Sequence, residues 1–192
     1  MKKLVLTVLA VATFGFVSAQ EEGIRFGAKA GLNIASISGD DTDDLDSRTS
    51  LHLGFVAEIP VTEKFAFQPE LIYSAQGATF DFAGEDVTIA LDYLNLPLMG
   101  KFYVAEGLSI QAGPQIGFLL SSKVKVDDED EDLEDVNGLD LGLNFGLGYQ
   151  LDMGLFFDGR YNLGLSNLDD SDSSDDFSQK NSVIQISVGY KF

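Results

Sequence analysis

The sequence contains no cysteine and only one histidine, His52. Without cysteine there is no disulfide framework, thiolate metal site, cysteine nucleophile or lipid-modified cysteine of the bacterial lipoprotein type. A single histidine excludes a multi-histidine zinc site. Positive charge is also scarce, with 12 lysines and arginines against 31 aspartates and glutamates. Because binding to nucleic-acid phosphates requires clustered lysine and arginine, we expect no nucleic-acid partner.

Long hydrophobic runs are missing after the first residues. The apolar stretch 4–17 follows Lys2 and Lys3 and precedes the small residues Ser18 and Ala19. A run of about 14 residues is too short to span a bilayer as a helix, and its flanks are typical of a secretory signal peptide. We therefore predict a signal peptide over 1–19 and one domain over 20–192. No later run reaches the roughly 18 apolar residues that a transmembrane helix needs.

The chain is both acidic and apolar. A formal net charge of -19 suggests a soluble or disordered acidic protein, yet 45% of the residues are hydrophobic and 15 are phenylalanine. This apolar content favours a folded chain, and 192 residues correspond to a single domain.

Most of the sequence after residue 23 alternates between apolar residues and small or polar residues. This period of two is typical of β-strands with two unlike faces. Near Tyr93 the apolar phase changes, and we expect a β-bulge there that resets the face. The predicted strands cover 24–34, 51–59, 65–74, 87–103, 108–118, 139–150, 155–164 and 184–192. The prediction is an all-β fold, an eight-stranded antiparallel up-and-down transmembrane β-barrel.

The predicted connections alternate in length. Three are tight, at 60–64, 104–107 and 150–153, whereas four are longer, polar and acidic, at about 38–50, 77–86, 122–138 and 166–181. An even number of strands, with short turns on one side and long loops on the other, is typical of outer-membrane barrels. We therefore expect a monomer in outer-membrane lipid, with both termini periplasmic and four acidic extracellular loops.

Composition of the polar face separates a membrane barrel from a soluble lipocalin-like barrel, which is the alternative. Glycine, asparagine, glutamine and serine dominate this face, as expected for the crowded lumen of a small barrel. Its few charges come in both signs, and we expect five cations to pair there with Glu58, Glu70, Asp92, Asp140 and Asp158, since an unpaired buried charge is costly. The predicted lumen cluster comprises Arg25, Lys29, His52, Glu58, Glu70, Lys101, Asp140, Asp158, Arg160 and Lys191.

The third predicted loop contains six consecutive acidic residues, 127–132. Carboxylate oxygens suit Ca²⁺, so Asp127, Asp128, Asp130, Asp132 and Asp135 are candidate ligands for weak Ca²⁺ binding. The run fails the EF-hand pattern, because Leu133 stands where the turn glycine belongs. A solvated anionic surface is the simpler interpretation, and a partner-binding surface is a further alternative. We expect no other cofactor.

Catalysis is not expected. Some outer-membrane barrels modify lipids through a serine, histidine and acid at the rim, but His52 has no evident serine partner in the sequence and is predicted to face the lumen. We interpret His52 as a hydrogen-bonding residue of the lumen.

Several short motifs, in order along the chain, resemble the PorT-like family of small outer-membrane β-barrel proteins, which are barrels of the OmpA/OmpX type. They are 29–33 (KAGLN), 93–98 (YLNLPL), 112–117 (AGPQIG), 160–165 (RYNLGL) and the C-terminal 189–192 (GYKF). The resemblance implies an eight-stranded barrel that the outer-membrane assembly machinery inserts, with Tyr190 and Phe192 as the assembly signal. It implies no single activity, although one member is linked to protein secretion.

We therefore expect an integral outer-membrane protein of structural or interaction type that displays acidic loops. The alternatives are a small-solute or ion porin, an accessory factor of a protein secretion system, and a lipid-modifying rim enzyme.

Overall fold

The computed structural model describes residues 23–40, 42, 45–82, 84–126, 129–133, 136–168 and 179–192, and the predicted signal peptide lies outside them. Within this part of the chain there are nine β-strands, and no helix is long and apolar enough to cross a membrane. The strands are β1 (Arg25–Gly39), β2 (Asp46–Pro60), β3 (Phe65–Phe82), β4 (Glu85–Tyr103), β5 (Leu108–Val126), β6 (Glu129–Asp132), β7 (Leu139–Gln150), β8 (Leu155–Gly164) and β9 (Gln179–Lys191).

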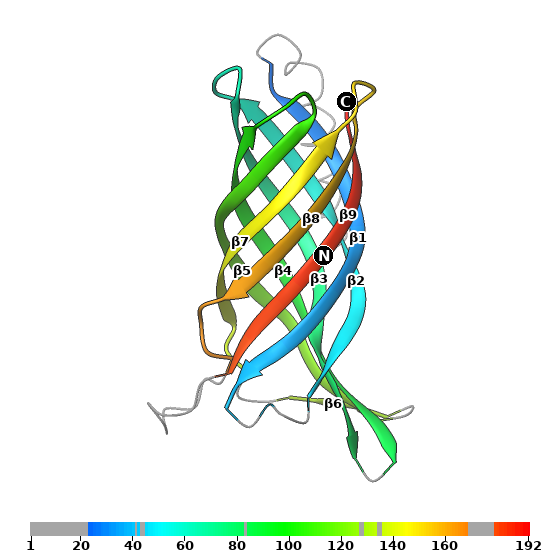
Figure 1. Cartoon of the computed structure of the whole chain (residues 1–192). Coiled ribbons are helices and arrows are strands. Elements are labelled where there is room, and N and C mark those ends of the chain that lie inside the picture. The colour runs from blue at the N-terminus through cyan, green and yellow to red at the C-terminus, as the bar shows by residue number, and fades with distance from the viewer. Residues whose placement is uncertain are drawn as a thin grey trace, which may run out of the picture.

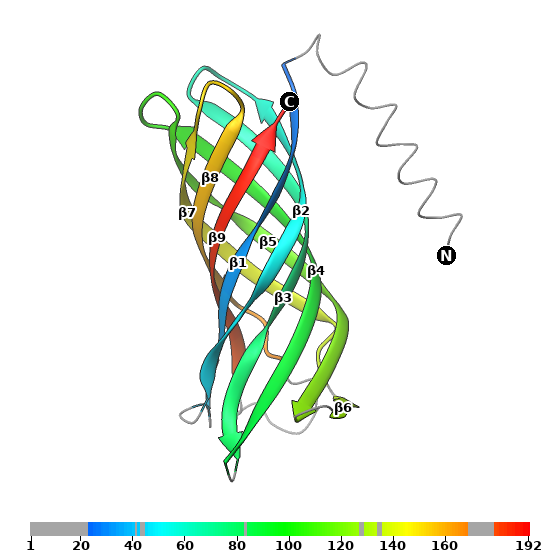
Figure 2. The same ribbon diagram turned by 90° about the vertical axis from the view of Figure 1, so that its right-hand side faces the viewer.

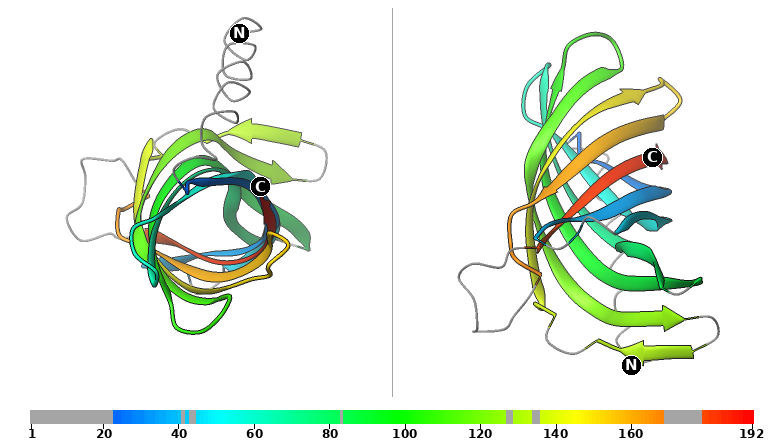
Figure 3. Two further views of the ribbon diagram at one scale, coloured as in Figure 1. Left: turned by 90° about the horizontal axis from the view of Figure 1, so that it is seen from above. Right: turned by 60° about the horizontal axis from the view of Figure 1, so that its bottom comes forward.

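Eight of these strands form a closed antiparallel ring (Figures 1 and 3). Each pairs with its neighbours in the sheet order β1, β2, β3, β4, β5, β7, β8, β9, and the ring closes where β9 pairs with β1 from Gly27↔Lys191 to Gly39↔Gln179. The ninth strand, β6, is an addition to the ring, and its one partner among the described strands is the far end of β5. The predicted fold, an eight-stranded up-and-down barrel, is confirmed.

The two ends of the barrel differ. At one end, which we call the turn end, four-residue turns at 61–64, 104–107 and 151–154 join the strands, and the C-terminal Phe192 lies beside Phe26. Gly107 and Gly154 occupy these turns with φ of 73° and 92°, in the left-handed region that favours glycine. At the opposite end, the loop end, β3, β4 and β5 project beyond the other strands, and β6 lies there (Figures 1 and 2).

The strands continue into segments that were predicted as loops. Predicted loop 77–86 is almost entirely strand, because β3 and β4 form a hairpin that pairs from Phe65↔Phe102 to Phe82↔Glu85. Predicted loops 38–50 and 122–138 likewise contain the start of β2 and all of β6. Cross-strand partners therefore stabilise polar residues that the alternation pattern alone does not assign to strands.

The predicted bulge near Tyr93 is in the neighbouring strand. Along β4 the buried positions keep one phase from Leu91 to Lys101, so the face does not reset at Tyr93. The register shift lies in the β4–β5 pairing, where Asp92 pairs with Ser121 and Tyr93 with Leu119, which leaves Leu120 as the extra residue on β5. Apolar side chains of β4 consequently enter the barrel interior near the loop end.

The outer face of the ring is apolar, as predicted. Large exposed side chains occupy it on every strand of the ring, including Leu53 on β2, Phe145 on β7 and Ile186 on β9. The alternate positions point inward and are buried, among them Lys29, Gln111 and Arg160. An apolar exterior around a polar interior is the arrangement of a transmembrane barrel and the reverse of a soluble one.

Close strand contacts depend on inward glycines. A Cβ atom on Gly113 would lie 2.0 Å from the backbone oxygen of Leu98, whereas one on Gly159 would meet nothing within 4 Å. We expect Gly113→Ala to lower the free energy of unfolding by about 1–3 kcal/mol through overpacking. Gly159→Ala, the matched control, should change it far less. Urea unfolding in lipid vesicles measures both, and equal effects would contradict the packing argument.

Candidate functional site: the barrel lumen

Polar side chains fill the turn-end half and the middle of the barrel. They form two ion-paired centres, one around Glu58 and one around Glu70, and a hydrogen-bonded chain through His52. The buried members include Lys29, His52, Glu58, Gln68, Glu70, Lys101, Gln111, Asp158, Arg160, Ser187 and Lys191. Each comes from an inward position of its strand, so the period-two pattern brings together residues that are far apart in the sequence.

The Glu58 centre lies nearest the turn end. Its carboxylate contacts three cations, Arg25, Lys101 and Lys191, with Lys101 Nζ at 2.9 Å from Oε2. The Tyr103 hydroxyl donates to the same oxygen at 2.8 Å. Glu58 and the two lysines are buried, whereas the Arg25 side chain is 45% exposed. The single negative charge of Glu58 therefore compensates only part of the positive charge of these three cations.

The Glu70 centre lies further along the barrel. Arg160 binds Glu70 through two parallel hydrogen bonds, Nη1 to Oε2 at 2.8 Å and Nη2 to Oε1 at 2.7 Å, and also donates to Asp158 at 3.1 Å. Lys29 Nζ lies 2.9 Å from Glu70 Oε2 and 3.8 Å from Asp158 Oδ2. Such bidentate, buried pairs join β1, β3 and β8 across the lumen, and they hold the guanidinium in one geometry.

His52 connects three strands through hydrogen bonds. Its Nδ1 lies 2.8 Å from Asn33 Oδ1, and its Nε2 lies 2.8 Å from Ser187 Oγ. The sequence shows no serine partner for His52, because Ser187 is 135 residues away on β9 and only the fold brings the two together. The spacing resembles a serine, histidine and asparagine triad, but the three side chains are at most 3% exposed. The arrangement therefore serves as an internal hydrogen-bonded chain.

Two of the five acids that we expected to pair with lumen cations, Asp92 and Asp140, do not belong to either ionic centre. Asp92 is only partly buried and lies beside the outward-facing Tyr73, outside the lumen. Asp140 faces the lumen near the loop end, where Ser166 donates to its Oδ1 at 2.9 Å, and no ion pair to it is found among the described residues. The two ionic centres thus combine the five predicted cations with only three acids, because pairing depends on height along the barrel as well as on face.

An apolar cap closes the lumen at the loop end. Its buried members come from three strands and one loop segment, and partly buried residues from β4, β5 and two further loop segments pack against them. They are Ile37, Ala78, Leu91, Tyr93 and Leu168, with Leu45, Ile89, Leu119 and Val136 packed around them. Backbone bonds tie the loop segments together, with Asn137 N donating to Leu168 O at 2.8 Å and Leu168 N to Gln179 O at 2.8 Å. Parts of the predicted acidic loops therefore fold inward.

The candidate Ca²⁺ ligands fall partly outside the described residues, which do not include Asp127, Asp128 or Asp135. Asp130 and Asp132 lie on β6, and Asp130 is 3.4 Å from Lys123 Nζ and 3.9 Å from Lys125 Nζ on β5. In the described part of the chain, no group of three or more acidic, histidine or cysteine side chains is arranged to hold a metal ion. Weak Ca²⁺ binding by this segment stays a prediction.

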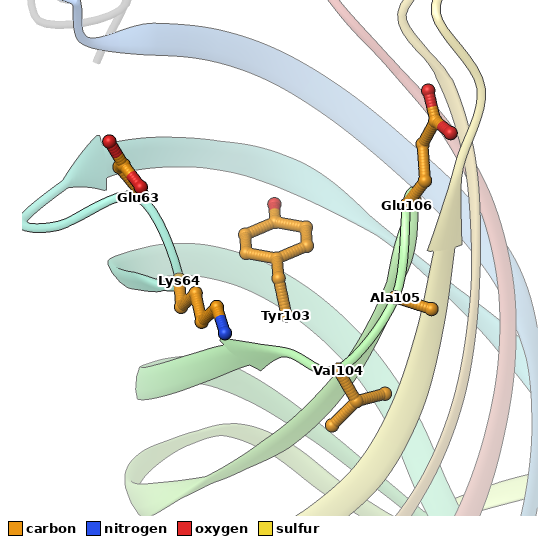
Figure 4. Close-up of a pocket in the computed structure, with 7 residues that line it drawn as sticks. Glu63, Lys64, Tyr103, Val104, Ala105 and Glu106 are labelled. Carbon is orange, nitrogen blue, oxygen red and sulfur yellow. The ribbon is translucent and has the colours of Figure 1, made fainter.

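At the turn end, a shallow pocket of about 400 Å³ lies between two turns (Figure 4). Glu63 and Lys64 line it from the first turn, and 104–107 line it from the second. The Tyr103 ring stands between them and joins the pocket to the Glu58 centre through its hydroxyl. Tyr190 and Phe192, the predicted assembly signal, are exposed near this end, with ring centroids 6.0 Å apart.

An eight-stranded ring with an apolar outer face and an ion-paired interior defines the class of transmembrane β-barrels of the outer membrane. A family model described as "Outer membrane protein beta-barrel domain" matches residues 18–170. The chain belongs to this family of proteins, which are located in the outer membrane. Comparison with curated proteins finds no match.

Solved structures show the same fold. Neisserial surface protein A is 13% identical, with a TM-score of 0.59, over 89% of this chain and 100% of that one. Ail, the attachment invasion locus protein of Yersinia pestis, is 16% identical, with a TM-score of 0.53, over 88% of this chain and 98% of that one. At such low identity the likeness shows the fold alone.

Proposed function

We propose that this protein is a closed outer-membrane barrel of structural or interaction type, which holds an acidic surface at its loop end. The observation that carries this proposal is the filled lumen. Ion pairs around Glu58 and Glu70 occupy the barrel from the turn end to its middle, and the apolar cap around Tyr93 covers the loop end. An eight-stranded barrel has an interior just wide enough for side chains, so little room is left for a solute path.

The proposal includes the orientation. A signal peptide over 1–19 would deliver the chain to the periplasm, where Tyr190 and Phe192 would present the last strand to the barrel assembly machinery. The turn end would then face the periplasm, and the loop end, with the acidic β6, would face outward. In this orientation residues 129–132 would lie at the cell surface, where the anionic strand β6, paired to Lys123 and Lys125, would be accessible to a partner.

The alternatives have less support. A diffusion porin requires an open lumen. A rim enzyme requires a reactive serine that lipid can reach, and Ser187 is 3% exposed inside the barrel. An accessory role in protein secretion rests on the PorT-like motifs alone, and those residues form strands of the barrel rather than a distinct site. We therefore also propose that the protein is not an enzyme.

Planar-bilayer recording tests the closed barrel. We expect purified, refolded wild-type protein to insert without a stable open state, because side chains from all parts of the ring meet in the lumen. Insertion is checked separately by protease protection of the same protein in vesicles, and a known porin serves as the positive control. A large, steady conductance from inserted monomer would overturn the proposal and favour the porin alternative.

A further inference from the structure

Asn137 and Gly138 are the last two residues before β7 at the loop end. The sequence contains seven asparagines, and Asn137 is the one that glycine follows. Because glycine has no Cβ atom, its backbone nitrogen can approach the side-chain amide of the preceding asparagine more closely than the nitrogen of another residue can. An Asn-Gly pair can therefore close to a cyclic imide, which is the first step of deamidation.

A hydrogen bond holds the Asn137 side chain against the peptide that follows it. The Leu139 backbone N–H donates to Asn137 Oδ1 at 3.0 Å, and such an Asx-turn folds the side-chain amide back over the Gly138 peptide. Only Cβ, Cα and the carbonyl carbon separate Asn137 Cγ from the Gly138 nitrogen, so this folding brings the two atoms within reach of each other. The same hydrogen bond withdraws electron density from the Cγ carbonyl, which makes the carbon a better target for a nucleophile.

The surroundings of Gly138 leave room for ring closure. Gly138 is exposed, and apart from its chain neighbours a Cβ atom built on it would meet no described atom within 4 Å. Its φ lies outside the left-handed region, so alanine can adopt the same backbone conformation. Five other asparagines are, in contrast, inward-facing strand residues that are at most 2% exposed, namely Asn33, Asn95, Asn144, Asn162 and Asn181. The geometry therefore favours reaction at position 137 over these positions.

Two backbone hydrogen bonds attach this Asn-Gly pair to the apolar cap. Asn137 N donates to Leu168 O at 2.8 Å, and Leu119 N donates to Gly138 O at 2.9 Å. Leu168 is a buried member of the cap, and Leu119 packs against it. The length of main chain between Asn137 N and Gly138 O therefore fits the spacing of these two cap residues.

We propose that Asn137 is a site of spontaneous deamidation in the folded barrel, and that its isoaspartate product loosens the apolar cap. Solvent base removes the Gly138 N–H proton, and the nitrogen attacks Asn137 Cγ. As the new N–Cγ bond forms, the Cγ–Nδ2 bond breaks, and Nδ2 takes a proton from water and leaves as ammonia. Water then opens the imide at either carbonyl, which leaves aspartate or isoaspartate at position 137. The reaction consumes water and releases ammonia, and it needs no oxidant or reductant.

The two products differ in the length of the main chain. In isoaspartate the chain runs through Cβ and Cγ, which adds one carbon and about 1.5 Å of bond between the two anchoring hydrogen bonds. Aspartate keeps the normal length, and both products replace a neutral amide with a negative charge. We therefore expect isoaspartate, and not aspartate, to disrupt the hydrogen bond from Leu119 N to Gly138 O.

The test of the site is incubation of the refolded barrel in lipid vesicles and mildly alkaline buffer, followed by peptide mass spectrometry and enzymatic methylation of isoaspartate. We expect both products to accumulate at position 137. Gly138→Ala adds a Cβ atom that fits the fold but obstructs ring closure, so it should lose most of the reaction. Gly159→Ala, the same change at another glycine with open space around it, should react like the wild type. A folded wild type that stays unmodified, or an equal rate in Gly138→Ala, would overturn the proposal.

Amide hydrogen exchange tests the effect on the cap. The Leu119 amide should exchange faster in the isoaspartate fraction than in fresh protein, because its acceptor is the Gly138 carbonyl. Asn137→Asp adds the charge at normal chain length and should keep the protection of fresh protein. Unchanged exchange in the isoaspartate fraction, or an equal loss of protection in Asn137→Asp, would contradict the link between chain length and the cap.

Discussion

Glu58→Gln should lower the free energy of unfolding by about 3–5 kcal/mol, the usual loss when one partner of a buried ion pair is removed. Glutamine keeps the shape of the side chain but leaves Arg25, Lys101 and Lys191 without their shared carboxylate. Both lysines are buried, so their charges cannot regain full hydration where they lie. The measurement is urea unfolding in lipid vesicles followed by circular dichroism, which suits a protein without tryptophan.

Glu63→Gln is the matched control for this substitution. Glu63 lies in the turn that follows β2 and is exposed, so the same chemical change should alter stability by less than about 0.5 kcal/mol. If Glu58→Gln also stayed below about 1 kcal/mol, the net value of an exposed ion pair, the Glu58 centre would not be a buried ionic centre. The interpretation of the turn-end lumen as ion-paired would then be wrong.

Phe145→Arg should destabilise the barrel in a bilayer by about 2–4 kcal/mol, the cost of a charged side chain on the lipid face near the midplane. Phe145 is in the middle of β7, between Ala112 and Tyr161, and is 50% exposed on the outer face. In a soluble barrel the same change would place a charge in water, where a surface substitution has little effect. Urea unfolding in vesicles distinguishes the two environments.

Val104→Arg is the comparison for the lipid-facing substitution. Val104 is also apolar and exposed, but it lies in the turn after β4 at the end of the barrel. A charge near the membrane interface costs about 0–1 kcal/mol. The loss of unfolding free energy in Phe145→Arg, compared with the loss in Val104→Arg, therefore reports the depth of each residue in the bilayer. Equal costs for Phe145→Arg and Val104→Arg would contradict the placement of the apolar band.

The lumen shows where reasoning from the sequence succeeds and where it does not. The two-residue alternation along each strand correctly predicts inward positions for Glu58, Glu70 and Arg160, because this alternation does not depend on the neighbouring strands. It could not pair them, since partners such as Arg160 and Glu70 are 90 residues apart and meet only through the register of several strands. Asp92 and Asp140 were assigned to pairs that the register does not allow.

The loop end was the least predictable region. The phase of Leu91 and Tyr93 predicts a bulge, since the alternation places apolar residues on the outward face along the whole strand. In the folded protein they face inward with Leu168 and form a cap, because inward positions near the end of the barrel are covered by loop segments rather than by the polar network. Segment 129–132 similarly pairs with β5 through lysine and aspartate partners that no apolar alternation reveals.

The sequence by itself determined the all-β class, the eight strands of the ring, the tight turns and the apolar exterior. These features follow from local rules, namely alternation along a strand and turn chemistry between strands. Only the tertiary structure decided which charges meet around Glu58 and Glu70, which serine reaches His52, and why Asp140 has no ion-pair partner among the described residues. These contacts depend on the register between strands and on the closure of the ring where β9 pairs with β1. Register and closure bring together residues that are far apart in the sequence.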